Sequence, residues 1–200
     1  MKCLDCFGRY DIILGSQSPR RKLLMEGARI PFRVMARPVP EVFPGYLPPL
    51  EVVKYLCRQK AACFEQELKD PGKLVITADT IVVHKGDIIN KPGDESEAFK
   101  MLTALSGSTH EVYTGVCMRK LDDERIFHDY SLVSFRELRS DEIRYYIDSC
   151  SPFDKAGAYG IQEWIGYIGI SGIQGSYHNV MGLPVHKVYS ELLDMLCKRP

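Results

Sequence analysis

The feature that most constrains the fold is the order in which apolar, strand-like runs and helical segments follow one another. Short apolar runs at 12–14, 32–35 and 74–76 alternate with helical patterns at 19–27 and 50–68. The other expected elements are strands at 81–83, 88–89, 110–119 and 126–135 and helices at 94–105, 140–148 and 184–196. This order predicts an α/β fold, in which helices flank a twisted mixed β-sheet.

The chain of 200 residues is long enough for one α/β domain with a sizeable core. We expect an N-terminal tail at 1–10 and a single domain at 11–200. The N-terminus carries acids and no apolar segment of the signal-peptide type, and no apolar run reaches the length of a membrane span. These features predict a cytoplasmic protein with no membrane contact.

Charge is balanced along the chain. Lys and Arg total 26, Asp and Glu total 26, and the pI is about 6.9. A general nucleic-acid binder usually shows a basic excess, so we expect no nucleic-acid partner. An anion would have to meet a local cluster of cations.

The seven cysteines are odd in number and scattered. This pattern favours reduced thiols of a cytosolic protein over a disulfide framework. Cys3 and Cys6 form a CxxC, but no second pair stands at the spacing of zinc ligands. A frayed N-terminal tail is therefore preferred to a structural zinc site.

A short apolar strand passes through small residues into a helix at the segment LGSQSPRR. Ser18 is the expected N-cap and Pro19 the first helical residue. The backbone N–H groups of such a helix start suit an anion. Arg20, Arg21 and Lys22 then occupy the first turn, where the helix dipole disfavours cations. A solvated helix start is the alternative, but the break in the rule favours a phosphate site.

Lys60 falls in the middle of the apolar arc of the helix expected at 50–68, at about 100° of rotation per residue. A lysine on the core-facing side of a helix must either extend its ammonium group to water or meet an anion. The sequence leaves both possibilities open.

Asp79 lies between the apolar runs 74–76 and 81–83. An ionised carboxylate between buried runs is costly unless it is paired or bound to a metal, and strand ends of α/β sheets often carry catalytic groups. A turn aspartate that caps Thr80 is the alternative. Glu41 is the isolated acid of a Pro-rich loop. Together the two carboxylates could hold Mg²⁺ or Mn²⁺ on a triphosphate.

Two further segments have weaker signals. Lys91 follows a strand and precedes Pro92, which fixes the backbone there. The segment 154–162 is rich in small residues, which permit close approach of a ligand to the backbone. Its last residue, Gln162, offers both a donor and an acceptor, as recognition of a base requires.

Taken together, these segments resemble the Maf family of nucleotide pyrophosphatases. The matching residues follow one another in family order from Leu14 to Pro184. They are Ser16-Gln17-Ser18-Pro19-Arg20-Arg21, Glu41, Lys60, Ala78-Asp79-Thr80, Lys91-Pro92, Ser106-Gly107 with His110, Thr114-Gly115, 154–162 and 179–184.

The resemblance implies a fold of the Maf and inosine triphosphatase type, with two lobes around a central cleft, and a homodimer. It also implies metal-dependent hydrolysis of a nucleoside triphosphate between its α- and β-phosphates, to a monophosphate and pyrophosphate. The long match at 154–162 is similar to the branch that acts on dTTP and UTP. Some members also accept CTP or modified pyrimidine nucleotides.

The resemblance also implies roles for individual residues. Asp79 matches the family's proton acceptor. The positions around the phosphates and the metal are matched by Ser16, Arg21, Glu41, Lys60 and Lys91. Those linked to base choice are matched by Arg20, Thr80 and Gln162. This chain departs from the family at Glu163-Trp164, where a glycine often follows the glutamine, so the indole could alter the choice of base.

Two other readings compete with this one. One is a pyrophosphatase that removes deaminated purine nucleotides such as ITP or XTP, which a comparison of substrates would separate. The other is a non-catalytic nucleotide-binding regulator of cell division. Retention of both Glu41 and Asp79 argues against an inactive enzyme.

Overall fold

The computed structural model describes residues 5–197 and divides the chain into two compact units. Unit 1 consists of Met1–Asp79, Thr114–Asp129 and Gly182–Pro200, and unit 2 consists of Thr80–Tyr113 and Tyr130–Met181. The predicted boundary at residue 10, the single domain at 11–200 and the central cleft stay predictions.

Seven strands form one mixed sheet in the part of the chain that the structure describes, which confirms the predicted α/β class. They are β1 (Asp11–Leu14), β2 (Arg33–Val34), β3 (Lys73–His84), β4 (Asp87–Ile89), β5 (Thr109–Lys120), β6 (Asp123–Phe135) and β7 (Ile170–Gln174). Their order is β2-β1-β3-β5-β6-β7, and β4 pairs with β3. Strand β1 runs parallel to β2 and β3, whereas the β3–β4 and β6–β7 pairs are antiparallel.

The α-helices are α1 (Pro19–Gly27), α2 (Pro49–Ala62), α3 (Glu95–Leu105), α4 (Ser140–Cys150), α5 (Trp164–Gly169), α6 (Tyr177–Met181) and α7 (Val185–Leu196). Single 3₁₀ turns lie at Phe7–Arg9, Glu67–Lys69, Pro152–Asp154 and Ala156–Ala158. Within residues 5–197, no helix is both long enough and apolar enough to cross a membrane.

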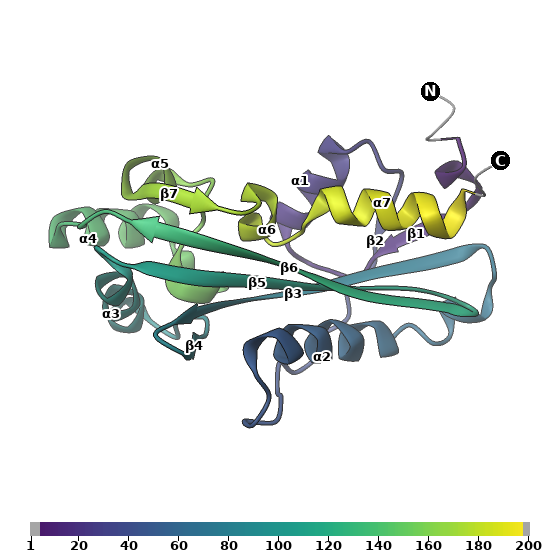
Figure 1. Ribbon diagram of the computed structural model, residues 1–200, viewed down its shortest axis with the longest axis horizontal. Helices are drawn as coiled ribbons and strands as arrows, with labels where there is room; N and C mark the ends of the chain where they lie inside the picture. Colours follow the sequence, from purple (N-terminus) through teal and green to yellow (C-terminus); the bar gives the residue numbers. More distant parts are fainter. Residues whose placement is uncertain (1–4, 198–200) are drawn as a thin grey trace. The chain divides into compact units, whose positions relative to one another are not determined.

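In unit 1, helices α1 and α7 cover one face of the strands and α2 covers the other (Figure 1). Helix α2 lies close to β5 because residue 115 is a glycine. A Cβ atom at Gly115 would stand 2.5 Å from the carbonyl oxygen of Val53, so a larger residue would push the helix away. Buried apolar side chains fill the space under α2, among them Cys57, Ala61, Phe64, Cys117, Ile13, Leu68 and Val75. The position of α2 sets the position of every side chain on its inner face.

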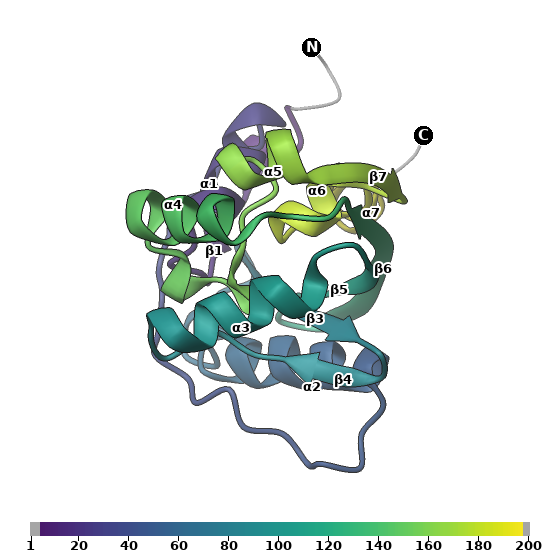
Figure 2. The same ribbon diagram turned by 90° about the vertical axis from the view of Figure 1, so that its left-hand side faces the viewer.

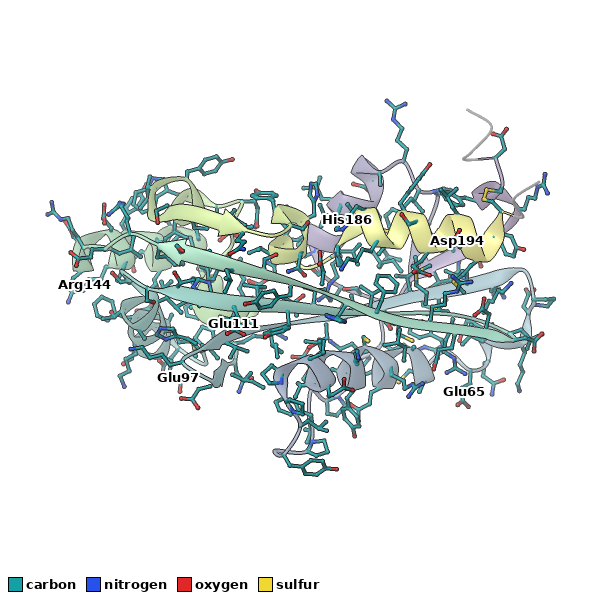
Figure 3. The ribbon with its side chains drawn as sticks, viewed as in Figure 1. Glu65, Glu97, Glu111, Arg144, His186 and Asp194 are labelled. Atoms are coloured by element: carbon teal, nitrogen blue, oxygen red, sulfur yellow. A yellow bond between two sulfur atoms is a disulfide. The ribbon has the colours of Figure 1, made fainter. Side chains whose placement is uncertain are left out.

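In unit 2, helix α3 packs against α4, and α4 packs against α5 (Figure 2). The guanidinium carbon of Arg144 on α4 lies 5.4 Å from the centre of the Phe99 ring on α3, a cation–π distance. Figure 3 shows Glu97 and Arg144 at the surface of these helices, where both residues are exposed. Beneath them, the side chain of Tyr146 is fully buried.

Two expectations about secondary structure were wrong in detail. The runs 74–76 and 81–83 are parts of one strand, β3, so Asp79 lies inside a strand and not at its end. The helix expected at 50–68 ends at Ala62, and a separate 3₁₀ turn follows. Periodicity found no element in the stretch 151–182, because its helices and its strand are too short to set up a pattern.

The N-terminal segment also differs from the frayed tail that we expected. Phe7 is fully buried and packs edge-on against Tyr189 of α7, with 5.7 Å between ring centres. Cys6 forms a disulfide with Cys197, so the expectation of reduced thiols throughout is wrong for this pair. Cys3 lies outside the described residues. The other described cysteines are free thiols: Cys57, Cys63, Cys117 and Cys150. A sequence separation of 191 residues hid the disulfide, because no local spacing signals it.

Candidate active site

The strand, loop and helix predicted at the start of the domain form as expected. Ser18 is the N-cap of α1, and its hydroxyl oxygen accepts from the N–H of Arg21 at 3.5 Å. The Ser16 hydroxyl oxygen accepts from the backbone N–H of Ser18 at 3.2 Å. Gly15 lets this loop lie against β3, because a Cβ atom there would stand 2.8 Å from the methyl carbon of Thr77. The loop therefore cannot move away from the sheet without losing these contacts.

The guanidinium group of Arg21 is held at two points within unit 1. Its Nε donates to the carbonyl oxygen of Gly182 at 2.7 Å, and its Nη1 donates to the Ser16 hydroxyl at 3.2 Å. Gly182 has a φ of 111°, a backbone conformation that glycine adopts without strain. Burial lowers the pKa of Arg21, and the nearby carboxylates of Asp79 and Glu41 act in the opposite direction. An arginine remains a cation under such conditions.

Lys60 meets anions, which settles the possibilities that the sequence left open. Its Nζ donates to Oε1 of Glu41 at 2.9 Å and to Oδ1 of Asp79. The Lys60 side chain is 16% exposed and that of Asp79 is 7% exposed, whereas Glu41 is 40% exposed. The ammonium group therefore bridges one buried and one accessible carboxylate. We call Ser16, Arg21, Glu41, Lys60 and Asp79 the unit 1 cluster.

Asp79 is tolerated inside β3 because its charge is compensated. A carboxylate in the middle of a strand with buried neighbours would otherwise be costly. The hydroxyl of Thr77, two residues earlier, donates to the carbonyl oxygen of Cys57 on α2 at 2.6 Å. This bond ties α2 to β3 one helical turn before Lys60, and so brings the lysine within reach of Asp79.

The carboxylates of Glu41 and Asp79 are a suitable but small ligand set for a divalent ion. One oxygen of each carboxylate is already bonded to the same cation, the Lys60 ammonium. Among the described residues, no group of three or more His, Cys, Asp or Glu side chains could hold a metal. Two carboxylates are the number that Mg²⁺ often takes from a protein when phosphate oxygens and water complete its shell. The residues therefore fit an ion that arrives with a phosphate ligand.

The remaining predicted site residues lie elsewhere. Arg20 precedes Arg21 in the first turn of α1 and is half-buried. Thr80 follows Asp79 on β3 and belongs to unit 2, as do Lys91 and Gln162. That these unit 2 residues join the unit 1 cluster around one ligand stays a prediction.

Unit 2 contains a second network, centred on Glu163. One carboxylate oxygen accepts a hydrogen bond from Gln162 Nε2 at 3.4 Å and forms an ion pair with Lys155 Nζ at 3.2 Å. The other accepts from the Tyr146 hydroxyl. We call Tyr146, Lys155, Gln162 and Glu163 the Glu163 network. Trp164 packs against Tyr145 with 4.9 Å between ring centres, and its effect on the choice of base stays a prediction.

Sequence reasoning missed two of these groups. The carbonyl of Gly182 gives no signal of its own, because every residue has a carbonyl. Glu163 did give a signal, as a departure from the family pattern beside Gln162, but the expected effect was assigned to the larger Trp164.

The geometry first identifies the class of protein. This is an α/β protein in which a helix N-terminus, with its backbone N–H groups, lies in the same unit as half-buried cations and a pair of carboxylates, an arrangement that suits a phosphate-bearing ligand. The chain belongs to the Maf-like protein family, whose model matches residues 11–195.

Curated relatives resemble the chain over nearly its whole length. A dTTP/UTP pyrophosphatase of Porphyromonas gingivalis is 50% identical over 193 residues, which cover 96% of this chain and 97% of the relative. A dTTP/UTP pyrophosphatase of Bacteroides thetaiotaomicron is 48% identical over 185 residues, or 92% of this chain and 95% of the relative. One from Christiangramia forsetii is 45% identical over 187 residues, with 94% and 95% covered.

Proposed function

We propose that this protein hydrolyses dTTP and UTP to the nucleoside monophosphate and pyrophosphate. The bridge that Lys60 forms between Glu41 and Asp79 is the observation that carries the proposal. A buried cation held between two acids is a ready partner for phosphate oxygens, and a buried acid beside it is a ready base. The relatives in three bacteria are named dTTP/UTP pyrophosphatases, which supports the choice of reaction and substrate.

In this proposal, the cations of the unit 1 cluster stabilise charge on the phosphate oxygens in the transition state. Arg21 is fixed by Gly182 and Ser16, and Lys60 by the two carboxylates, so little reorganisation is needed when the reaction begins. Lys91 of unit 2 adds a third cation. Neutralising and positioning make up most of the catalysis in phosphoryl transfer.

Asp79 accepts the proton of the attacking water. The water oxygen forms a bond to the α-phosphorus while the bond from that phosphorus to the bridging oxygen breaks. Pyrophosphate leaves with the bonding electrons. Lys60 is bonded to Oδ1 of the Asp79 carboxylate and not to Oδ2, which supports a role for the carboxylate as a base.

A divalent ion, Mg²⁺ or Mn²⁺, completes the proposed site. Glu41 and Asp79 would hold it together with phosphate oxygens, and it would withdraw negative charge from the triphosphate. Glu41 is well placed for this because its side chain is 40% exposed, so an incoming ion can reach it.

Choice of base belongs to Arg20, Thr80 and Gln162 in this proposal. We further propose a homodimer in the cytoplasm, as the family resemblance implies. The free thiols of the described cysteines support a reducing compartment, and the disulfide between Cys6 and Cys197 is the exception. Light scattering of the purified protein would test the dimer.

The test is a panel of dTTP, UTP, CTP, ATP, ITP and 7-methyl-GTP, each with Mg²⁺ or Mn²⁺, with products separated by ion-exchange chromatography. We expect monophosphate and pyrophosphate, mainly from dTTP and UTP. Omission of the metal, with a chelator present, should abolish turnover.

Other outcomes point to other functions. The same products mainly from ITP would support removal of deaminated purines and overturn the assignment of Gln162. A diphosphate plus free phosphate would exclude attack at the α-phosphorus. If nothing is turned over with either metal, a nucleotide-binding regulator replaces the enzyme.

A further inference from the structure

Glu163 accepts a hydrogen bond from the side chain of Gln162. It stands at the N-cap position of α5, yet its side chain makes no capping bond to that helix. Its carboxylate instead accepts from Gln162 Nε2 at 3.4 Å and from the Tyr146 hydroxyl, and it forms an ion pair with Lys155 Nζ at 3.2 Å. Its donors are therefore side chains, and its position is set by groups that do not belong to α5.

The donors that hold Glu163 are themselves buried and take part in further hydrogen bonds. Tyr146 is fully buried, and its hydroxyl oxygen accepts from the backbone N–H of Gly160 at 3.0 Å. Lys155 is 7% exposed and also donates to Asp154 at 2.7 Å. A side chain at residue 160 would collide with the network, because a Cβ atom there would stand 2.7 Å from the Glu163 carboxyl carbon and 2.8 Å from Gln162 Nε2. The backbone is thus packed directly against both side chains.

A carboxylate fixes which way an amide side chain points. Ionised Glu163 has no proton to donate, so only the NH₂ group of Gln162 can bond to it. The carbonyl oxygen of Gln162 must then face the other way. That oxygen is buried and has no hydrogen-bond partner among the described residues. Buried acceptors are nearly always satisfied, so this one calls for a donor from a ligand or a water molecule.

We propose that Glu163 is a positioning residue that locks the Gln162 amide with its carbonyl oxygen as the acceptor for the N3–H of uracil or thymine. This inference rests on the proposed function. Uracil and thymine both carry a hydrogen on N3, whereas the N3 of neutral cytosine is itself an acceptor. Two facing acceptors repel, so a locked amide rejects CTP, and an amide free to rotate accepts it.

The decisive variant is Glu163→Met, which keeps the length of the side chain and removes the acceptor. The measurement is kcat/KM for UTP and for CTP under the same conditions. We expect the ratio of UTP to CTP to fall at least about tenfold, because selectivity built on a hydrogen bond is lost when the partner can turn. Glu163→Gln retains a carbonyl oxygen that can accept from Gln162, and it should restore most of the ratio.

A purely structural role predicts a different pattern. Glu142→Gln is the matched control, because Glu142 is also an ion-paired acid of unit 2, bonded to Arg136 at 2.8 Å. It should lower thermal stability and leave the UTP to CTP ratio unchanged. If Glu163→Met lowers kcat/KM for both nucleotides by the same factor, as Glu142→Gln would, then Glu163 does not position Gln162 and the proposal is overturned.

A milder variant guards against misfolding of Glu163→Met. Tyr146→Phe removes one hydroxyl that holds the carboxylate, so the ratio should fall by a smaller factor; an unchanged ratio in a folded Tyr146→Phe protein overturns the proposal. A wild-type protein that hydrolyses UTP and CTP equally well also overturns it, while the proposed reaction stands. Turnover of neither nucleotide by the wild type would overturn the proposed function, and the inference with it.

Discussion

The unit 1 cluster and the Glu163 network use buried charge in opposite ways. In unit 1, Lys60 is shared by Glu41 and Asp79, and Arg21 is fixed by neutral oxygen atoms of Ser16 and Gly182. Each cation is therefore held in place by oxygen atoms of the same unit. In unit 2, several donors converge on one carboxylate, and the group that is positioned is the neutral amide of Gln162.

Under the proposed function, the unit 1 cluster sets the rate of hydrolysis and the Glu163 network sets the choice of base. Phosphates are common to every nucleoside triphosphate, so a change in the unit 1 cluster should affect all substrates by a similar factor. Bases differ in where they carry hydrogen, so a change in the Glu163 network should alter the ratio between substrates. Variants of each region test whether these two effects are separate.

The largest effect is expected for Asp79→Asn. An amide of the same shape can still contact Lys60 but cannot accept the proton of a water molecule, so turnover of dTTP should fall about 10³-fold or more. Steady-state kinetics measure the loss, and Asp148→Asn, an exposed acid on α4, is the control. Near-normal turnover would remove Asp79 from the mechanism, and a change confined to one base would break the division between the two regions.

Lys60→Met should have the largest effect on stability. It leaves the carboxylate of Asp79, which is 7% exposed, without its ion-pair partner, and loss of one partner of a buried pair costs about 3 to 5 kcal/mol. Urea denaturation measures the change. Lys54→Met is the control, because Lys54 forms a surface pair with Glu51 at 3.0 Å on the same helix and should contribute less than about 1 kcal/mol. Equal losses in the two variants would mean that the unit 1 pair is no more than a surface contact.

The pH dependence of stability should arise partly in unit 2. His110 is buried, and its Nε2 lies 2.7 Å from the Tyr159 hydroxyl. Burial, with a smaller effect of His84, lowers the pKa of His110 from 6.5 to about 4. The imidazole is therefore neutral in the folded protein, while the unfolded chain takes up a proton below about pH 6.5. This contribution is fully present above pH 6.5 and is lost as the pH falls toward 4, by up to about 3 kcal/mol.

The check is the free energy of unfolding between pH 7 and pH 4 for the wild type and for His110→Gln. The difference between the two curves isolates His110 from the carboxylates that also titrate in this range. His178→Gln, at an exposed position, should follow the wild type. Parallel curves for the wild type and His110→Gln would show that His110 does not contribute to acid sensitivity.

The smallest effect is expected for Gly182→Ala. A φ of 111° is strained for alanine, at a cost of about 1 to 3 kcal/mol, and relief of that strain would move the carbonyl that holds Arg21. Steady-state kinetics should show kcat/KM reduced about tenfold for dTTP, UTP and CTP alike, because an Arg hydrogen bond of roughly 1.5 kcal/mol is weakened. Gly8→Ala, where no atom lies within 4 Å of the added Cβ, is the control. A changed ratio between UTP and CTP would link the two regions.

Much of the fold and part of the site followed from local pattern. Ser18 and Pro19 define the start of α1 by their chemistry alone, and the apolar arc around Lys60 showed that this lysine faces the core. The strand end that we expected at Asp79 was wrong. An acid between two apolar runs is typical of a strand end unless an ion-pair partner compensates its charge, and local sequence does not reveal that partner. In the folded protein Lys60 is that partner, so the strand continues through Asp79.

The sequence by itself determined the α/β class and the elements with a clear period, because these depend on contacts between near neighbours. Only the tertiary structure decided that Lys60 joins Glu41 to Asp79, that the Gly182 carbonyl fixes Arg21 and that Cys6 meets Cys197. It also decided that Tyr146 and Lys155 hold Glu163 in place beside Gln162. The physical reason is that a charge or a donor is satisfied by whichever group the packing brings within about 3 Å, however far apart the two lie in the chain.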